Sequence, residues 1–238
     1  MIINDFIEEL KKININCTVN HIKLLEDYYN YLIEYNSHTN LTTITNKEDV
    51  YLKHFYDSLT IFKDIDISRS YKVLDIGSGA GFPGIVLKIF NPNIELTLMD
   101  SNNKKTKFLT ELVAKLQLKD VTVVNDRAEL YITNHREKFD IVVSRAVAKT
   151  SILIELGIPY LKVQGKLIIM KASNDTLKEE LNNCNKIYDI LNCNLEKIDS
   201  FTLPIEGSER NIVVITKNNI TNDKYPRSYD KILKNSLK

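Results

Sequence analysis

The chain has 238 residues, of which 43% are hydrophobic and 26% are charged. This composition excludes a disordered chain, because it supplies enough apolar side chains for one sizeable core. The net charge of +1 excludes the overall basic field that a general nucleic-acid coat protein carries. The small sum hides an asymmetry, since residues 1–70 hold 7 basic and 11 acidic side chains and the remainder is basic.

Three irregularly spaced cysteines, Cys17, Cys184 and Cys193, argue against a disulfide framework. No Cys or His spacing typical of zinc ligands is present, so we expect no metal site. The first ten residues carry acids within an apolar stretch and indicate an amphipathic helix rather than a signal peptide. No apolar run approaches the ~18–20 residues that span a bilayer. These features predict a soluble cytoplasmic protein without membrane contact.

Residues 1–70 contain no glycine and place apolar side chains at helical spacing, as at Tyr51, Phe55, Leu59 and Phe62. We therefore predict an N-terminal helical extension over this range. At the other end, residues 218–238 hold five basic and two acidic side chains. They form either a basic tail with a role of its own or a frayed terminus.

Between these ends, residues 71–217 alternate short β runs with helical stretches. The alternation predicts one α/β domain with a mostly parallel seven-stranded sheet and helices on both faces. The last two β runs are joined by a link too short for a crossover helix, so they should form an antiparallel pair. The strands are expected at 72–76, 95–99, 121–124, 139–143, 166–170, 194–203 and 211–216, and the helices at 84–90, 104–117, 127–133, 150–160 and 174–189.

The most informative segment is the glycine-rich stretch Asp75–Gly84, which reads DIGSGAGFPG. Gly77, Gly79 and Gly81 follow a predicted strand and precede a helix, an arrangement that lets backbone approach a ligand closely. Phe82 stands where a dinucleotide fingerprint has its third glycine. Asp75 adds a carboxylate, which suits a cationic ligand and would repel a pyrophosphate. A tight turn without a ligand is the structural alternative.

Two further segments end predicted strands at the same sheet edge. Asp100 follows the second strand, where α/β folds place an acid that binds ribose hydroxyls. It could instead cap the helix that begins near Asn103. Ala128 and Glu129 follow the third strand, where an adenine would lie, although a solvated helix start is equally compatible.

This pattern of a D-x-G-x-G-x-G loop with a distal acid resembles the class I S-adenosylmethionine (SAM)-dependent methyltransferases, which have a Rossmann-like fold. The segment after the fourth strand, residues 142–148, has no Pro-Pro motif, no cysteine nucleophile and no evident base. A target atom with no proton to lose, such as guanine N7, would fit this segment. Methylation of a small-molecule oxygen or amine is the rival, although it usually requires a base or a metal.

Motifs over almost the whole chain are similar to those of the bacterial small-subunit ribosomal RNA guanine-N7 methyltransferases, also called glucose-inhibited division protein B. The resemblance implies the cofactor SAM, with S-adenosylhomocysteine as the product. It implies cofactor contacts at Gly77, Phe82, Ala128, Glu129 and Arg145, with Asp100 on the ribose. The glycine-rich loop adds Asp75, Gly79 and Gly81 to the expected cofactor site. The matching segments are Asn40–Thr42, His54–Leu59, Asp75–Gly84, Asp100–Leu109, Ser144–Ala148, Gly207–Asn211 and Lys224–Arg227.

The resemblance also implies a substrate, 16S ribosomal RNA in the small subunit or in an assembly intermediate. We expect a monomeric enzyme. Candidate RNA contacts are Lys171, Arg210, Lys224 and Arg227. A non-catalytic module that binds SAM or RNA is a further alternative.

Three features near the expected site remain open. Arg145 is expected to position the reactants at the pocket mouth, but it could instead pair with a core carboxylate. His54 and Asp57 lie on one helix face, where local packing competes with a direct role in catalysis. The resemblance ends after Arg227, so how the following residues dock is not given by the motifs.

Overall fold

The computed structural model describes residues 1–145, 148–172 and 177–237. The strands are β1 (Lys72–Ile76), β2 (Glu95–Asp100), β3 (Val121–Asn125), β4 (Phe139–Arg145), β5 (Leu161–Ala172), β6 (Cys193–Thr202) and β7 (Glu209–Lys217). The α-helices are α1 (Ile3–Lys12), α2 (Val19–Thr39), α3 (Lys47–Val50), α4 (Asp57–Leu59), α5 (Gly84–Phe90), α6 (Asn103–Lys115), α7 (Ala128–Tyr131), α8 (Thr150–Gly157), α9 (Leu177–Asn182), α10 (Asn185–Leu191) and α11 (Tyr229–Lys234). A π-helical segment, Tyr51–Tyr56, joins α3 to α4, and 3₁₀ turns cover Thr60–Lys63, Ile132–Asn134 and Ile158–Tyr160.

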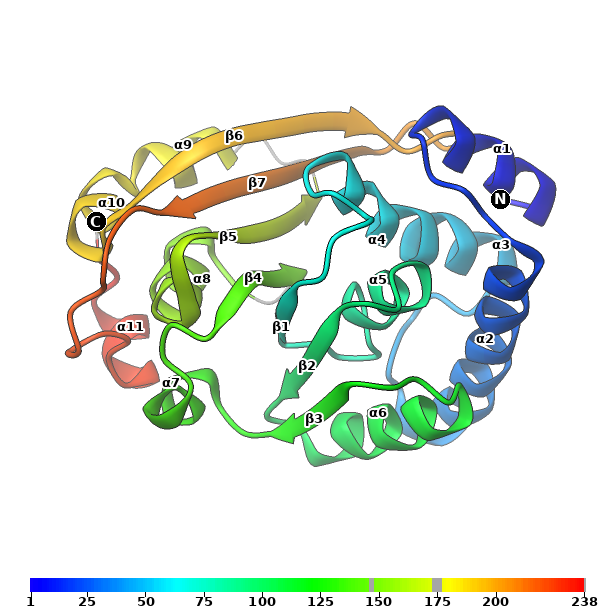
Figure 1. Ribbon diagram of the computed structural model, residues 1–238, viewed down its shortest axis with the longest axis horizontal. Coiled ribbons are helices and arrows are strands. Elements are labelled where there is room, and N and C mark those ends of the chain that lie inside the picture. Colours follow the sequence, from blue (N-terminus) through cyan, green and yellow to red (C-terminus); the bar gives the residue numbers. More distant parts are fainter. Residues whose placement is uncertain (146–147, 173–176, 238) are drawn as a thin grey trace.

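One seven-stranded sheet forms the centre of the molecule, with the strand order β3-β2-β1-β4-β5-β7-β6 (Figure 1). Neighbours among β1 to β5 are parallel, and β7 runs antiparallel to both β5 and β6. The predicted fold is therefore confirmed, including the terminal antiparallel pair. Because β1 to β4 are parallel, their carboxyl ends meet at one edge, where α/β folds bind ligands.

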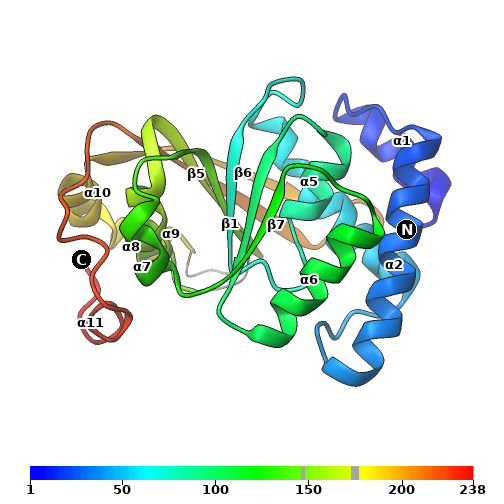
Figure 2. The ribbon, with the colours of Figure 1, turned by 60° about the horizontal axis from the view of Figure 1, so that its bottom comes forward.

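The N-terminal helices lie on the same face of the sheet as α5 and α6 (Figure 2). They share one hydrophobic core with that face, in which Phe6, Tyr28 and Phe55 are fully buried. The hydroxyl of Tyr28 also donates to the carbonyl of Ala80 in the glycine-rich loop. The predicted helical extension thus packs directly behind the part of the sheet edge that carries the motif.

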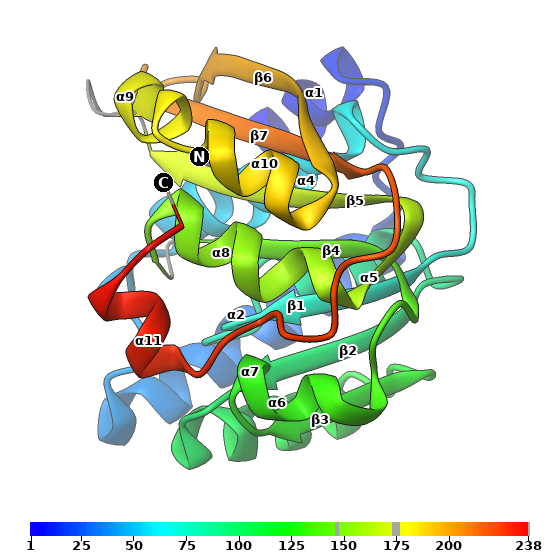
Figure 3. The ribbon, with the colours of Figure 1, turned by 90° about the vertical axis from the view of Figure 1, so that its left-hand side faces the viewer.

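The opposite face carries α7 to α11, so the C-terminal segment is docked rather than frayed (Figure 3). Tyr225 and Ile232 are buried in the core of this face. Arg136 donates to the backbone carbonyls of Thr221, Asp223 and Tyr225, which fixes the path of the chain between β7 and α11.

Two local expectations differ from the structure. The helix predicted over 174–189 is two short helices, α9 and α10, and residues 173–176 lie outside the described part. The cap of α6 is Asn102, whose side chain accepts from Lys104 N, and not Asp100. Across the described residues, no helix is long and apolar enough to cross a membrane.

Candidate functional site

The glycine-rich loop turns sharply between β1 and α5. Gly77, Gly79 and Gly81 have φ angles of 74°, 59° and 96°, which side chains rarely allow. The backbone N–H groups of Gly77 and Ser78 donate to the carbonyl of Met99 at 2.8 and 3.0 Å, which holds the loop against the end of β2. The loop therefore presents its backbone to the sheet edge.

Asp75 lies beneath this loop and not in the pocket wall that we expected it to form. Strand alternation directs its side chain to the same face as Val73, under α5. The carboxylate is fully buried, and its Oδ2 accepts from Gly84 N at 2.9 Å. Burial raises the pKa of Asp75 to about 7. Asp75 thus fastens the loop to the start of α5.

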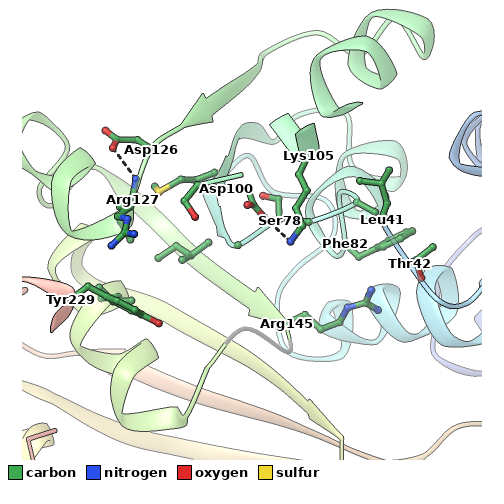
Figure 4. Close-up of a pocket in the computed structure, with 18 of the residues that line it drawn as sticks. Leu41, Thr42, Ser78, Phe82, Asp100, Lys105, Asp126, Arg127, Arg145 and Tyr229 are labelled. Atoms are coloured by element: carbon green, nitrogen blue, oxygen red, sulfur yellow. Dashed lines mark hydrogen bonds and ion pairs between the residues drawn. The ribbon is translucent and has the colours of Figure 1, made fainter. Parts of the chain in front are cut away.

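A cavity of about 500 Å³ lies in front of the loop (Figure 4). It runs along the carboxyl ends of β3, β2, β1 and β4. The predicted residues in its wall are Gly77, Gly79, Phe82, Asp100, Ala128, Glu129 and Arg145, whereas Asp75 and Gly81 are not among its lining residues. Gly81 faces away from the cavity and toward the core, since a Cβ there would stand 2.7 Å from Ile85 Cγ1 and 2.7 Å from the Tyr28 hydroxyl.

Asp100 stands at the middle of the cavity. Its Oδ2 accepts from Gly79 N at 3.0 Å and faces Lys105 Nζ at 3.6 Å, while Oδ1 accepts from Asn102 N at 2.9 Å. These contacts fix the carboxylate at the mouth of the loop, where it could accept hydroxyl groups of a ribose.

Ala128 and Glu129 form one end of the cavity, together with Arg127 and Tyr229. The hydroxyl of Tyr160 donates to the carbonyl of Ala128, which secures the first turn of α7. Glu129 Oε1 lies 3.8 Å from the Arg127 guanidinium. Tyr229 belongs to the C-terminal segment, and no motif in the sequence predicts that its ring reaches this wall.

Arg145 forms the other end of the cavity, at the end of β4. Its Nη1 donates to Lys53 O at 3.1 Å and to Asp57 Oδ2 at 3.3 Å, and its Nη2 lies 3.1 Å from His54 Nδ1. The guanidinium also lies over the ring of Phe82, at 5.0 Å from the centroid. Arg145 thus pairs with a buried carboxylate and also lines the cavity. Residues 146 and 147 of its motif lie outside the described part.

His54 is surrounded by polar partners. Its Nδ1 lies 3.1 Å from Arg145 Nη2 and also 3.1 Å from the carbonyl oxygen of Lys53, and its Nε2 lies 3.2 Å from Thr42 Oγ1. Burial and the positive charge of Arg145 lower the pKa of His54 to about 3. His54 is thus a neutral group that orients Arg145. The π-helical segment and the start of α4 bring the Lys53 carbonyl, His54 and Asp57 to the same side, where all three contact Arg145.

A second cavity, of about 240 Å³, adjoins the first and shares His54 and Arg145 with it. Two predicted RNA contacts, Lys171 and Arg210, line this cavity. Lys171 Nζ lies 3.1 Å from Glu180 Oε2, and Arg210 Nε lies 3.7 Å from Asp57 Oδ1. Both cations are therefore balanced by a carboxylate.

The other two predicted RNA contacts lie apart from this cavity. Lys224 is exposed, with its Nζ 5.2 Å from the centroid of the Tyr225 ring. Arg227 forms a bidentate pair with Glu155, with Nε–Oε1 at 2.8 Å and Nη2–Oε2 at 2.7 Å. Because Glu155 is fully buried, Arg227 anchors the tail, and its guanidinium is not presented to a phosphate as the sequence suggested.

Sequence comparison with known families decides the identity. The family model GidB, described as rRNA small subunit methyltransferase G, matches residues 21–213. The chain belongs to this family. Among curated proteins it is 44% identical to the ribosomal RNA small subunit methyltransferase G of Bacillus velezensis, over 95% of each chain. Its identity to the protein of that name from Bacillus cereus is 43%, again over 95% of each chain.

Solved structures of low sequence identity show the same fold as this GidB-family chain. Ribosomal protein L11 methylase from Lactobacillus delbrueckii has a TM-score of 0.53 at 14% identity, covering 70% of this chain and 79% of its own. A mutant of MtNAS in complex with S-adenosylmethionine has a TM-score of 0.54 at 16% identity, covering 83% and 73%. The fold is that of the class I SAM-dependent methyltransferases.

The geometry of the first cavity fits SAM as the cofactor. Positive-φ glycines leave the loop without side chains in front of the ligand, and Asp100 is placed for ribose hydroxyls. Phe82 and Ala128 give apolar surface on either side of that carboxylate. Among the described residues, no group of three or more His, Cys, Asp or Glu side chains is arranged to hold a metal ion.

Proposed function

We propose that this protein transfers the methyl group of SAM to N7 of a guanine in a loop of 16S ribosomal RNA. Methylation of small-subunit ribosomal RNA with SAM follows from membership of the GidB family. The target atom and the mechanism are our proposal. The observation that carries it is the wall between the two cavities, in which Arg145 is held by a neutral His54 and by Asp57.

This wall favours a target that needs no deprotonation. Guanine N7 has an in-plane lone pair and no proton, so transfer breaks the sulfur–methyl bond and moves the positive charge to the purine. Both ring nitrogens of His54 have partners, and Asp57 is engaged by two arginines. These groups are therefore poorly suited to remove a proton. They suit positioning of the reactants, which can supply a large share of a rate enhancement.

Arg145 is the residue best placed to position the base. Within the described residues, Nη1 and Nη2 hold the wall through contacts to Lys53 O, Asp57 and His54. An arginine has five N–H groups, so donors remain for the O6 atom beside N7 of a guanine. The proposal thus gives Arg145 two tasks, closing the methyl-donor cavity and orienting the base.

The second cavity supports recognition of an unpaired guanine. It combines apolar side chains, Met170, Phe201 and Ile212, with the cations Lys171 and Arg210. Such a lining suits a flipped base with a phosphate at the rim, and the N7 edge of a guanine inside an A-form helix is out of reach. One chain supplies both cavities, so the proposal has the enzyme act as a monomer. It also places the reaction in the cytoplasm, on RNA in the small subunit or in an assembly intermediate.

The proposal is tested by mapping 7-methylguanosine in 16S ribosomal RNA from cells with and without the gene. Reduction followed by aniline cleaves the RNA at this base, so the proposal expects one cleavage site that disappears in the deletion strain. A plasmid carrying the wild-type gene should restore the site, and one carrying Arg145→Lys should restore much less. Unchanged cleavage in the deletion strain would refute methylation at N7.

A further inference from the structure

The C-terminal segment contributes one aromatic side chain to the wall of the cofactor cavity. Tyr229, the first residue of α11, lies at the same end as Arg127 and opposite Thr42 (Figure 4). Its ring is half-buried at the edge of a cavity that is otherwise built from residues before position 157. A segment far along the chain therefore completes this end of the site.

The position of Tyr229 relative to Asp100 indicates which part of the cofactor it faces. Asp100 ends β2 and is placed for the ribose, and the cavity continues from there beyond the end of β3. The glycine-rich loop and Arg145 lie on the other side of Asp100. The adenine therefore falls at the end bounded by Ala128 and Tyr229. An aromatic ring there offers the flat apolar surface on which a base can stack.

The backbone that carries Tyr229 is held in place by buried contacts. Two residues before the ring, Arg227 forms its bidentate pair with Glu155 of α8, and its backbone N–H donates to the same carboxylate at 3.0 Å. On the other side, Ile232, which belongs to α11 itself, is 1% exposed and anchors the helix to the core. The fork geometry of an arginine–carboxylate pair permits little rotation, so the ring is presented in one place.

We propose that Tyr229 is an adenine-binding residue, whose ring stacks on the base of the cofactor, and that residues 221–232 act as a strap that holds it. The strap contains the Lys224–Arg227 motif, and Tyr229 follows the point at which the resemblance of the motifs ends. The inference rests on the SAM binding contained in the proposed function.

Titration calorimetry on the full-length protein tests this assignment, with SAM and adenosine as probes. Tyr229→Ala should bind both about tenfold more weakly, while Tyr229→Phe should stay within about twofold of wild type because it keeps the ring. Leu233→Ala is the matched control on the same helix, since Leu233 is 55% exposed. It should bind as the wild type does, and circular dichroism should show that all variants are folded.

Three results would overturn the assignment. They are wild-type affinity in Tyr229→Ala, equal loss in Tyr229→Phe and Tyr229→Ala, and a loss for SAM without a loss for adenosine. Failure of the wild-type protein to bind SAM would instead contradict the proposed function. The two failures are therefore distinguishable in one set of titrations.

Discussion

At the scale of single residues, Asp75 is the group whose protonation should most affect stability. Its pKa is raised from 3.8 to about 7, so between these values the folded state keeps a proton that the unfolded state releases. The free energy of unfolding should therefore fall as pH rises from about 4 to 7. Asp75→Asn keeps an acceptor for Gly84 N but cannot ionise. Relative to wild type, it should gain about 2–3 kcal/mol between pH 5 and pH 8.

Urea denaturation of both proteins at several pH values measures this difference. Asp5→Asn, at an exposed carboxylate in α1, is the control and should leave the pH dependence of wild type unchanged. A constant difference between Asp75→Asn and wild type from pH 5 to pH 8 would show that burial does not retain the proton.

Many residues that the sequence predicts for the cofactor site line the cavity, and the reasons are local. Phe82, Asp100 and Arg145 stand at loop positions or strand ends, which parallel pairing brings to one edge. Asp75 does not line the cavity, because the period of two along a strand directs its side chain to the face of Val73. The partner of Arg227 could not be inferred, since Glu155 lies 72 residues away in the sequence.

At the scale of elements, the glycine-rich loop has two kinds of glycine. Gly81 faces Ile85 and Tyr28, where a Cβ would stand 2.7 Å from each, at a φ of 96°. Gly79, at φ 59°, would place a Cβ 3.8 Å from Gly77 O. Gly81→Ala should therefore cost roughly 2–4 kcal/mol through overpacking and backbone strain, and Gly79→Ala about 1 kcal/mol. Chemical denaturation without ligand checks this order, and equal losses would contradict it.

The strap, residues 221–232, is the second element. Arg227 was expected to contact RNA, but the structure pairs it with the buried Glu155. Charge reversal at Arg227 places a carboxylate against the buried Glu155, so Arg227→Glu should release residues 218–237 and weaken SAM binding at least fivefold. Lys224→Glu changes the same charge on the exposed face and should leave SAM binding intact while weakening RNA binding. Calorimetry and limited proteolysis measure the two effects. Equal SAM affinity in both variants would contradict the anchoring role of Arg227.

Element boundaries were predictable wherever a hydrophobic period was sustained, and less so elsewhere. All seven strands and α5 were placed from alternation and from the glycine-rich loop. The stretch after β5 forms two short helices, α9 and α10, although Leu181, Cys184 and Ile187 are buried in one core at helical spacing. The π-helical segment that aims His54 and Asp57 at Arg145 has no sequence signature, since its apolar spacing resembles that of an α-helix.

At the scale of the whole molecule, the N-terminal helices and the sheet form one packed unit. Tyr28 stacks on Phe82 with ring centroids 5.2 Å apart and donates to the loop carbonyl of Ala80. The N-terminal extension therefore supports the cofactor cavity from behind. An aromatic on a helical face indicates a core position in general, and the sequence does not say which loop it supports.

The distribution of charge over the molecule predicts how binding of RNA responds to salt. The cations around the second cavity already face acids, as Lys171 faces Glu180 and Arg210 faces Asp57. A phosphate that displaces such a carboxylate releases few counterions. Each phosphate neutralised on a single strand contributes about −0.7 to the slope of log K against log salt. We therefore expect a slope between about −1 and −3 for a 16S fragment that carries the target loop.

Fluorescence anisotropy at increasing KCl concentrations measures this slope. Lys224→Gln removes an exposed cation and should make the slope shallower by about 0.7, which corresponds to one phosphate contact. Leu233→Ala leaves the charge unchanged and should keep the wild-type slope. A slope steeper than about −5 would mean that many unpaired cations contact the RNA. That result would contradict the proposal that this enzyme recognises a single loop, which the net charge of +1 and the paired cations support.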